Sequence, residues 1–434
     1  MNSQVYRHLI IDKSPGETRV AILEQGRLAN IFIERENRPW LRGATILGKV
    51  QAVKKELNAV FIDLGGAIGY LEGVPDLMPV EGEAVLVEVL SESQSSKGPR
   101  VTASISLRGA LANIYPMQNG YAISRNIKAK GRRALIRDLL LSLIPENIGV
   151  WVRDAAIDCD FEDLKSDLES LLSRWNNLQN QIKPGIQPKI LEPSPGPEGI
   201  AFDPTLSSLI DEGKNGLLFN KFDIDNEINK ALEKQIEVKG GAVLIFDEME
   251  ALTAIDIDLA SYKTAHSHPF ELAELLAKEI FWQIRLRKIS GIILIDYPRE
   301  KTQKIRNHFY SEFKKVAISD ENRISIHGWT RTGLLEITRD RLEPTLRDIF
   351  LEKNSKTKLL DEVVAVSTLR KLTNNTNKIA FPQLVCSPEL RATLYGPFRE
   401  AFDVVNKNLG IKVDVQVDPQ MDKESVYIQT RRKV

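Results

Sequence analysis

The sequence predicts a multidomain protein of the α/β class. Three observations support this prediction: the chain has 434 residues, it contains a run of short strands divided by glycines, and it contains a strand–helix–strand pattern. A chain of this length exceeds one ordinary hydrophobic core, so about two to four domains are expected. The apolar content of 42% and the charged content of 27% are typical of a soluble globular protein.

The first strands are predicted from alternation and from turn residues. HLIIDK and TRVAILEQGRLANIFIER alternate like a β-meander, with turns at Pro15-Gly16 and Gln25-Gly26. From Arg42, five short strand candidates follow within about seventy residues, which fits a small closed barrel of the oligonucleotide-binding type. They are ATILGKVQAVKKEL, NAVFIDLG, AIGYLEG, EAVLVEVLSE and RVTASISL.

The later elements are mixed. FEDLKSDLESLLSRWNNLQNQI predicts a polar helix, and QPKILEPSPGPEGIAFDP is a proline-rich boundary. A helix is expected around Thr205–Glu212. RISIHGWTRTGLLEITRDRLEPTL indicates a strand, a turn and then a helix, and the last eighty residues predict a small α+β domain.

Two apolar strands run directly into an aspartate. LTAIDIDLA and GIILIDYPRE are separated by the amphipathic segment PFELAELLAKEIFWQIRLRKI, which predicts a βαβ unit with parallel strands. If these strands are neighbours, Asp256 and Asp296 lie together at the carboxyl edge of the sheet, where open α/β sheets bind ligands. Asp258 projects on the same face as Asp256, because side chains alternate along a strand.

Oxygen-only ligands favour a hard divalent ion, so these acids predict Mg²⁺ or Mn²⁺ rather than zinc. The alternative is that one or more of the acids pairs with a nearby arginine or lysine, since ion-pair networks also gather carboxylates. The same alternative holds for Arg285 and Arg287 in the intervening helix, which otherwise are candidates for binding a phosphate backbone.

The barrel carries candidate RNA-binding residues. Proteins that bind single-stranded nucleic acid combine aromatic rings for base stacking with cations for the backbone. Phe61 and Tyr70 lie in consecutive strand candidates, and Lys49, Lys97 and Arg100 are cations in the same part of the sequence. Further positive charge is available in the basic run RNIKAKGRR, from Arg125 to Arg133. The alternatives are that the rings are core residues and that the basic run is a solvated loop. The formal net charge of zero requires any RNA site to be a local basic patch.

Composition also indicates the compartment. Cys159 and Cys386 have neither a metal-site spacing nor a disulfide pattern, which suits a reducing environment. The N-terminus lacks a signal-peptide layout, and no apolar run approaches the roughly 20 residues of a membrane span. A cytoplasmic protein without a membrane partner is therefore expected.

Several strings resemble the ribonuclease E/G family, in collinear order from the N-terminus to about Leu346. RGATILGKVQAVKKELNAVFIDLGGAIGYLEG resembles the embedded S1 domain, and GVWVRDAA resembles part of the 5′-sensor. GGAVLIFDEMEALTAIDIDLA, IRLRKISGIILIDYPRE and WTRTGLLEITRDRLEP resemble the catalytic region. The resemblance implies an α/β multidomain fold in which an RNase H-like domain is interrupted by an S1 (OB-fold) barrel and a 5′-sensor-like segment. A DNase I-like subdomain and a small α+β domain follow.

The expected domain order has six parts. They are 1–41, the first part of the RNase H-like domain; 42–108, the S1 barrel; 109–185, the 5′-sensor-like subdomain; 186–235, the second part of the RNase H-like domain; 236–350, the DNase I-like catalytic subdomain; and 351–434, the C-terminal domain.

The resemblance implies Mg²⁺-dependent cleavage of single-stranded RNA in processing or decay of rRNA or mRNA. Asp256 and Asp296 match the family's metal-binding aspartates, and Asp258 replaces a common asparagine beside them in the catalytic site. Phe61 and Tyr70 match aromatic residues that contact RNA, to which Lys97, Arg100 and Arg125 add charge.

Three departures from the family's pattern qualify this expectation. In the 5′-phosphate pocket, formed from Arg153, Asp154 and Arg331, Asp154 stands where the family has threonine, so weakened 5′-monophosphate sensing is expected. RDIFLEKNSKTKLLDE contains no cysteine, so neither structural zinc nor a zinc-link dimer is expected, and the oligomeric state stays open. The sequence shows no long scaffolding tail, so a role as a hub of a larger assembly is not expected.

Two other functions remain open. One is a catalytically impaired RNA-binding protein of the same fold, which would act in ribosome or RNA maturation. The other is a Mg²⁺ phosphoesterase acting on small nucleotides, which would leave the barrel without a function.

Overall fold

The computed structural model describes residues 7–57, 59–72, 79–94, 97–182, 185, 187–201, 208–259, 268–298, 303–353, 355, 357–374 and 381–430. The chain forms two compact units. Unit 1 consists of Met1–Pro39 and Ser208–Val434, and unit 2 consists of Trp40–Ser207. Unit 2 therefore interrupts unit 1 in the sequence, and the mixed α/β, multidomain class is confirmed.

The first sheet of unit 1 is the expected meander, completed by a distant strand. Its order is β14 (Ser208–Lys214), β1 (Arg7–Ser14), β2 (Glu17–Glu24) and β3 (Arg27–Arg35). The turn between β2 and β3 places Gln25 at φ 54° and Gly26 at φ 78°, the left-handed pair that a tight hairpin requires. The prediction of a helix around Thr205–Glu212 is wrong for the described residues of that range. They belong to strand β14, which pairs with β1 in parallel.

The second sheet of unit 1 contains the predicted βαβ unit. The parallel neighbours β17 and β18 are connected through α6, so that prediction is confirmed. The segment expected as strand, turn and helix is instead the hairpin β19–β20, followed by the short helix α8. In order, the strands are β15 (Gln235–Val238), β16 (Ala242–Glu248), β17 (Leu252–Asp258), β18 (Gly291–Asp296), β20 (Leu335–Arg339) and β19 (Ile324–Trp329).

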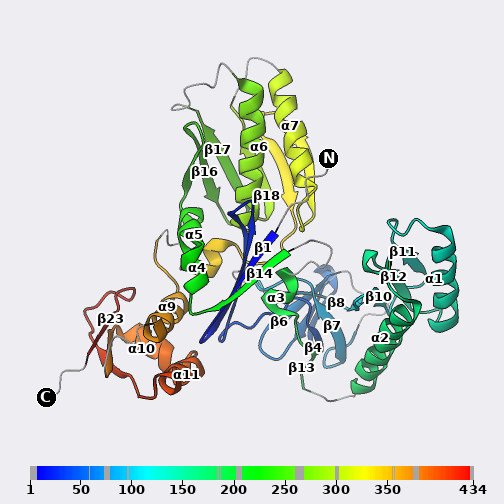
Figure 1. Ribbon diagram of the computed structural model, residues 1–434, viewed down its shortest axis with the longest axis horizontal. Helices are drawn as coiled ribbons and strands as arrows, with labels where there is room; N and C mark the ends of the chain where they lie inside the picture. The colour runs from blue at the N-terminus through cyan, green and yellow to red at the C-terminus, as the bar shows by residue number, and fades with distance from the viewer. Residues whose placement is uncertain are drawn as a thin grey trace. The chain divides into compact units, whose positions relative to one another are not determined.

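Helices α6 (Pro269–Leu286) and α7 (Gln303–Ala317) cover one face of this sheet (Figure 1). The buried residues of β17 and β18 alternate with more exposed ones, so one face is buried and apolar. The other face is mixed: it carries Leu252, Ala254, Ile292 and Leu294, and it ends in the aspartates at the carboxyl ends of the strands. The apolar face and the two helices form one core, which includes Ile255, Ile257, Ile293, Ile295, Leu276, Ile280, Phe309 and Phe313.

Smaller helices complete the first sheet and the C-terminal region of unit 1. The first sheet packs against α4 (Leu217–Lys221), α5 (Ile224–Leu232) and α8 (Leu346–Phe350). The C-terminal region has its own core, in which helices pack against a small sheet. It contains α9 (Asp361–Asn374), α10 (Pro388–Tyr395), α11 (Arg399–Leu409) and the sheet β22 (Asp414–Val417), β21 (Pro382–Cys386) and β23 (Tyr427–Thr430).

Unit 2 begins with the predicted five-stranded barrel, which a β4–β7 pairing closes. Its strands are β4 (Thr45–Lys54), β5 (Ala59–Asp63), β6 (Ile68–Glu72), β8 (Arg100–Thr102) and β7 (Ala84–Val89). A further strand, β13 (Lys189–Glu192), pairs with β4, although its residues fall in the segment 186–235 that we expected in another domain.

The remainder of unit 2 is a four-stranded sheet with its own core. The sheet order is β11 (Tyr121–Ile123), β12 (Gly149–Val152), β10 (Ala112–Tyr115) and β9 (Leu107–Arg108), packed against α1 (Lys130–Leu143) and α2 (Phe161–Gln181). The short helix α3 (Gly196–Ala201) follows β13. None of the helices in the described parts of the chain has the length and apolar character needed to cross a membrane.

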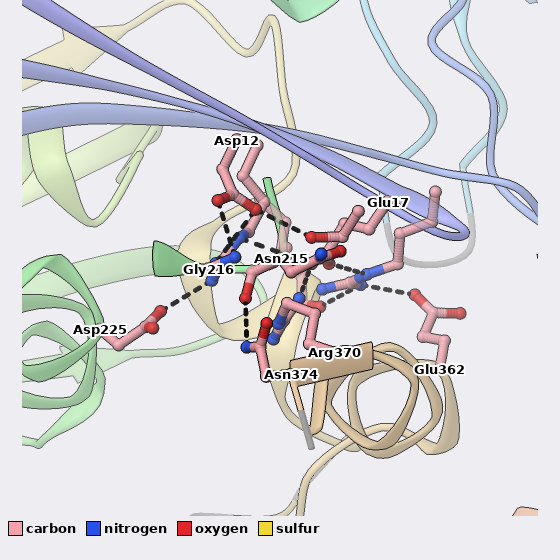
Figure 2. A network of polar contacts seen from close by, with 12 residues as sticks. Asp12, Glu17, Asn215, Gly216, Asp225, Glu362, Arg370 and Asn374 are labelled. Carbon is pink, nitrogen blue, oxygen red and sulfur yellow. Dashed lines mark hydrogen bonds and ion pairs between the residues drawn. The ribbon is translucent and has the colours of Figure 1, made fainter. Parts of the chain in front are cut away.

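A buried network of charged side chains joins the first sheet to α9 (Figure 2). Glu17 is only 4% exposed, and its carboxylate accepts a hydrogen bond from Arg35 Nε at 2.9 Å. The same carboxylate pairs with Arg370 of α9. Arg35 also donates to Glu362 of α9 at 2.9 Å. Each of the two sheet residues, Glu17 and Arg35, therefore forms an ion pair with an oppositely charged residue of α9. The C-terminal domain is therefore attached to the first sheet by ion pairs as well as by apolar contacts.

The charge environment of Glu17 favours its ionised form. Burial alone would raise the pKa of Glu17, but the positive charges of Arg370, Arg35 and Arg19 lower it to about 2. Because the folded pKa is below the unfolded value of 4.5, ionised Glu17 stabilises the fold above pH 4.5. This stabilisation is lost as the pH falls from 4.5 toward 2.

Replacing Glu17 with glutamine is expected to lower the free energy of unfolding at neutral pH by roughly 3 kcal/mol, because it leaves buried arginines without a counter-charge. The difference from wild type should shrink as the pH falls toward 2, where Glu17 is protonated in both states. Urea denaturation at a series of pH values measures both effects. Asp403→Asn removes an exposed partner of Arg399 and should have little effect at any pH. A Glu17→Gln deficit that stays constant with pH would contradict this account.

Candidate active site

Asp256 and Asp296 are direct partners in the parallel pairing of β17 with β18. Both side chains are exposed, on the face opposite to the buried Ile255 and Ile295. Neighbouring strands lie about 5 Å apart, so the two carboxylates start from adjacent backbone positions at one edge of the sheet. One Asp256 oxygen, Oδ1, accepts a hydrogen bond from the Ile257 amide at 2.9 Å. The sequence-based prediction of two neighbouring acids is therefore confirmed.

Asp258 lies two residues beyond Asp256 on the same face, opposite Val243 of β16. It is exposed, and β18 ends at the level of Asp256. In the described ranges, no group of three or more His, Cys, Asp and Glu side chains is arranged to hold a metal ion. Among the described residues, Asp256 and Asp296 are thus the candidate donors at this edge, and Asp258 does not complete a three-carboxylate cluster with them.

This donor set suits a small hard cation. Mg²⁺ is typically bound by one or two carboxylates, and it keeps several water ligands. Two exposed carboxylates on one open face supply oxygen atoms, and within the described ranges no histidine or cysteine joins them in a group that could hold a metal, so the set is a poor one for zinc. The residues present at the edge therefore fit Mg²⁺ or Mn²⁺.

Arg331 lies at the same edge of the sheet as the two aspartates. It belongs to the turn between β19 and β20, and the first residue of β20, Leu335, pairs with Ile295, the residue before Asp296. Arg331 is exposed, and it forms no hydrogen bond or ion pair with the described part of the chain. The turn is ordered by its own hydrogen bonds, since Thr330 Oγ1 accepts from the Leu334 amide at 3.0 Å.

The same face of the sheet carries further polar residues on β19 and β20, at positions that were not predicted from the sequence. Glu336 lies opposite Leu294, two residues before Asp296, and His327 bonds Thr338 at 3.0 Å. These positions become recognisable only once the hairpin β19–β20 is paired with β18.

Arg285 of α6 and Arg287, the C-cap residue of that helix, do not reach this edge. Arg285 donates to Glu24 at 2.8 Å, so the ion-pair alternative is correct for it. Arg287 is 1% exposed and bonds Gln283 and the carbonyl of Glu233. Neither side chain is available to an RNA backbone at the aspartates.

In unit 2, the barrel brings the two predicted aromatic residues together. Phe61 of β5 and Tyr70 of β6 are direct cross-strand partners, with ring centroids 5.8 Å apart in an edge-to-face arrangement. Both are partly exposed, unlike the barrel core around Val60 and Ile62. The rings therefore form a surface pair and are not core residues.

The predicted cations of unit 2 differ in their roles. Arg100 is the partner of Tyr70 in the pairing of β6 with β8, and Lys97 is exposed in the loop before β8. Arg125 is exposed after β11. At the end of the basic run, Arg132 bonds the carbonyl of Ala156 at 2.9 Å, and Arg133 bonds that of Ser124 at 2.7 Å. The last two arginines are therefore structural.

Arg153 and Asp154 both form hydrogen bonds with other residues of unit 2. Asp154 accepts hydrogen bonds from Ser124 and from Asn126, the latter at 2.7 Å. The hydrogen bonds from Ser124 and Asn126 lower the pKa of Asp154, so the carboxylate is ionised at neutral pH. Arg153 Nη1 donates to the Gly109 carbonyl at 3.0 Å. These two residues belong to unit 2, whereas Arg331, which we expected in the same pocket, belongs to unit 1.

Comparisons with known proteins match this arrangement. The family model described as "Ribonuclease E/G family" matches residues 106–197 and 200–342, which together make up more than half of the chain and include Asp256, Asp296 and Arg331. Ribonuclease G of Salmonella typhimurium and ribonuclease G of Escherichia coli are each 24% identical, over 96% of this chain and 98% of the relative. Ribonuclease E of Escherichia coli is 27% identical over 78% of this chain and 37% of its own length. The chain belongs to the ribonuclease E/G family.

Proposed function

We propose that this protein is a Mg²⁺-dependent endoribonuclease that cleaves single-stranded RNA in the cytoplasm, in processing or decay of rRNA or mRNA. Membership of the family supports the enzyme class. The single observation that carries the chemistry is the register that pairs Asp256 with Asp296, two exposed acids on the same face of the sheet.

The domain assignment is part of the proposal. The first sheet of unit 1 with the helices around it corresponds to the interrupted RNase H-like domain, and the sheet that carries the aspartates corresponds to the DNase I-like subdomain. The barrel of unit 2 corresponds to the S1 domain and the sheet of β9–β12 to the 5′-sensor. The barrel assignment is supported by the closed five-stranded order and by the exposed aromatic pair.

In the proposed reaction, Asp256 and Asp296 would hold the ion, which could be Mg²⁺ or Mn²⁺. When bound, such an ion polarises a phosphoryl oxygen and lowers the pKa of a coordinated water. Arg331 binds a phosphate of the RNA backbone from the adjacent turn, offsetting charge that accumulates at the scissile phosphate. Asp258 adds a negative charge beside the pair and assists it without being one of the two principal ligands.

Residues of unit 2 bind the bases and much of the backbone of the RNA in this proposal. Phe61 and Tyr70 provide faces for stacking bases, which is tolerant of base identity because every base has a π-face. Lys97, Arg100 and Arg125 supply positive charge for the backbone. A neutral protein gains RNA affinity in this way from a local patch, with the salt dependence typical of phosphate contacts.

Weakened sensing of a 5′-monophosphate is the second part of the proposal. Asp154 keeps its negative charge at neutral pH and uses its oxygens to accept from Ser124 and Asn126. A phosphate approaching Arg153 therefore meets a fixed negative charge, and at about 4 Å this repulsion costs on the order of 1–4 kcal/mol.

Asp256→Asn and Asp296→Asn should each reduce Mg²⁺-dependent cleavage of a labelled A/U-rich single-stranded RNA by at least about a hundredfold, because each removes a charged ligand. RNA affinity should change by less than about twofold, since stacking and backbone contacts lie elsewhere. Asp258→Asn should cause a smaller loss. Asp340→Asn, an exposed aspartate just after β20, serves as the matched control. Binding without any wild-type cleavage would instead favour an RNA-binding protein that has lost catalysis.

Asp154→Thr should raise the ratio of cleavage rates for 5′-monophosphorylated and 5′-hydroxyl RNA by at least about fivefold, because it removes a repulsive charge from the pocket. The wild-type ratio should be near one. Competition between the two labelled substrates in one reaction measures the ratio directly. Asp158→Thr changes an exposed aspartate four residues away and should leave it unchanged. A strong monophosphate preference in the wild type would refute weakened sensing.

A further inference from the structure

A cavity of about 550 Å³ lies in unit 1 at the end of the catalytic sheet away from the aspartates. Glu248, at the end of β16, is one of its lining residues and pairs with Thr253, three residues before Asp256 on β17. At about 3.3 Å per residue, the two places are separated by roughly 10 Å along the strand. Phe246, another lining residue, pairs with Ile255 and lies on the buried face of the sheet, opposite to the aspartates. The cavity is therefore distinct from the candidate active site, and its size suits a small organic molecule.

Arg287 gives the cavity a buried positive charge. The side chain is 1% exposed, and its guanidinium lies 4.1 Å from the centre of the Phe246 ring. Its Nε donates to Gln283 at 3.0 Å and its Nη1 to the Glu233 carbonyl at 2.6 Å. Its Nη2 has no hydrogen-bond partner within the described residues. A buried donor without a partner is costly, so this nitrogen is a candidate for an acceptor that the chain does not supply.

Arg347 of α8 is a second cation in the lining. It is held by backbone carbonyls, since Nη1 donates to Leu232 at 3.1 Å and Nη2 to Ser355 at 2.8 Å. Both guanidinium groups are fixed by neutral carbonyls, and neither has a carboxylate at ion-pair distance in the described chain. The charge of Glu248 acts on both from farther away. Such a pair is suited to an oxyanion.

We propose that this cavity binds a small organic molecule carrying an oxyanion group, either a phosphate ester or a carboxylate. The oxyanion is held between Arg287 and Arg347. The organic part lies against the apolar portion of the lining, which consists of Leu232, Phe246, Leu351 and Leu359. Asn229 supplies a further polar contact, and the exposed Lys234–Asp247 ion pair closes part of the rim.

Glu248 makes this binding dependent on pH. Burial raises the pKa of Glu248 to about 7, and the negative charge of Asp348 raises it further. The positive charges of Arg287 and Arg347 act in the opposite direction and lower the pKa. The other charged groups of the lining are Glu233, Lys234 and Asp247. Below pH 7 the Glu248 carboxyl is largely neutral, so an oxyanion meets two cations. Above pH 7 the ionised carboxylate competes with the oxyanion for them.

Equilibrium dialysis of the full chain with radiolabelled sulfate tests the site, because sulfate keeps a constant charge between pH 6 and 8. Binding to wild type should be about fivefold to tenfold tighter at pH 6 than at pH 8. Glu248→Gln should bind at pH 8 as tightly as wild type does at pH 6, with little pH dependence. Arg347→Ala should weaken binding at least about tenfold. Arg287→Met should do the same, provided that its urea unfolding is still cooperative.

The same assay with radiolabelled adenosine monophosphate and citrate distinguishes the two sources of the oxyanion. Tighter binding of the nucleotide assigns a phosphate ester, and tighter binding of citrate assigns a carboxylate. Asp256→Asn, which changes the other end of the sheet, should leave all affinities unchanged. The proposal is overturned if folded wild type binds none of the three probes at 10 mM, a concentration at which even weak sites fill. Binding that neither Arg347→Ala nor Glu248→Gln alters would overturn it equally.

Discussion

The parallel hydrogen-bond ladder between β17 and β18 is the constraint on which the candidate active site depends. It sets Asp256 opposite Asp296. The ladder is parallel because α6 returns the chain to the edge of the sheet at which β17 begins, so that β18 runs in the same direction as β17. The ladder is rigid because Ile255, Ile257, Ile293 and Ile295 are buried under α6 and α7. A slip of one residue in either strand would turn an aspartate into that apolar core, so the burial of the isoleucines fixes the register.

The charged groups of unit 1 divide into structural and available ones. The structural groups include Glu17, Arg35 and Arg370, whose ion pairs attach the C-terminal domain to the first sheet. Arg285 is also structural, because it pairs with Glu24. The available groups are Asp256 and Asp296 with Arg331 at one end of the catalytic sheet, and Arg287 with Arg347 at the other. The proposed chemistry and the proposed ligand site both follow from the second class, because its aspartates are exposed and Arg287 Nη2 has no partner among the described residues of a lined cavity.

Local sequence patterns predicted the elements whose periodicity matches their burial. The βαβ unit, the meander and the five-stranded barrel are confirmed. Their strands are short apolar or alternating runs bounded by turn residues, and these signals are local in the sequence. Ser208–Lys214 was misread as helix, since its strand character comes from pairing with β1, some 200 positions away in the chain. Arg287 was assigned to a possible RNA contact because sequence does not reveal burial. The cavity was missed because its lining comes from four separate segments.

Locating a divalent ion in the protein tests the central claim most directly. Crystals grown or soaked with Mn²⁺, measured at the manganese absorption edge, should show an anomalous peak within about 2–2.5 Å of carboxylate oxygens of both Asp256 and Asp296. The peak should disappear in Asp296→Asn under the same conditions, while β17 and β18 keep their register. A peak bound elsewhere, or none between these two residues at saturating Mn²⁺, would contradict the assignment of this sheet edge as the catalytic centre.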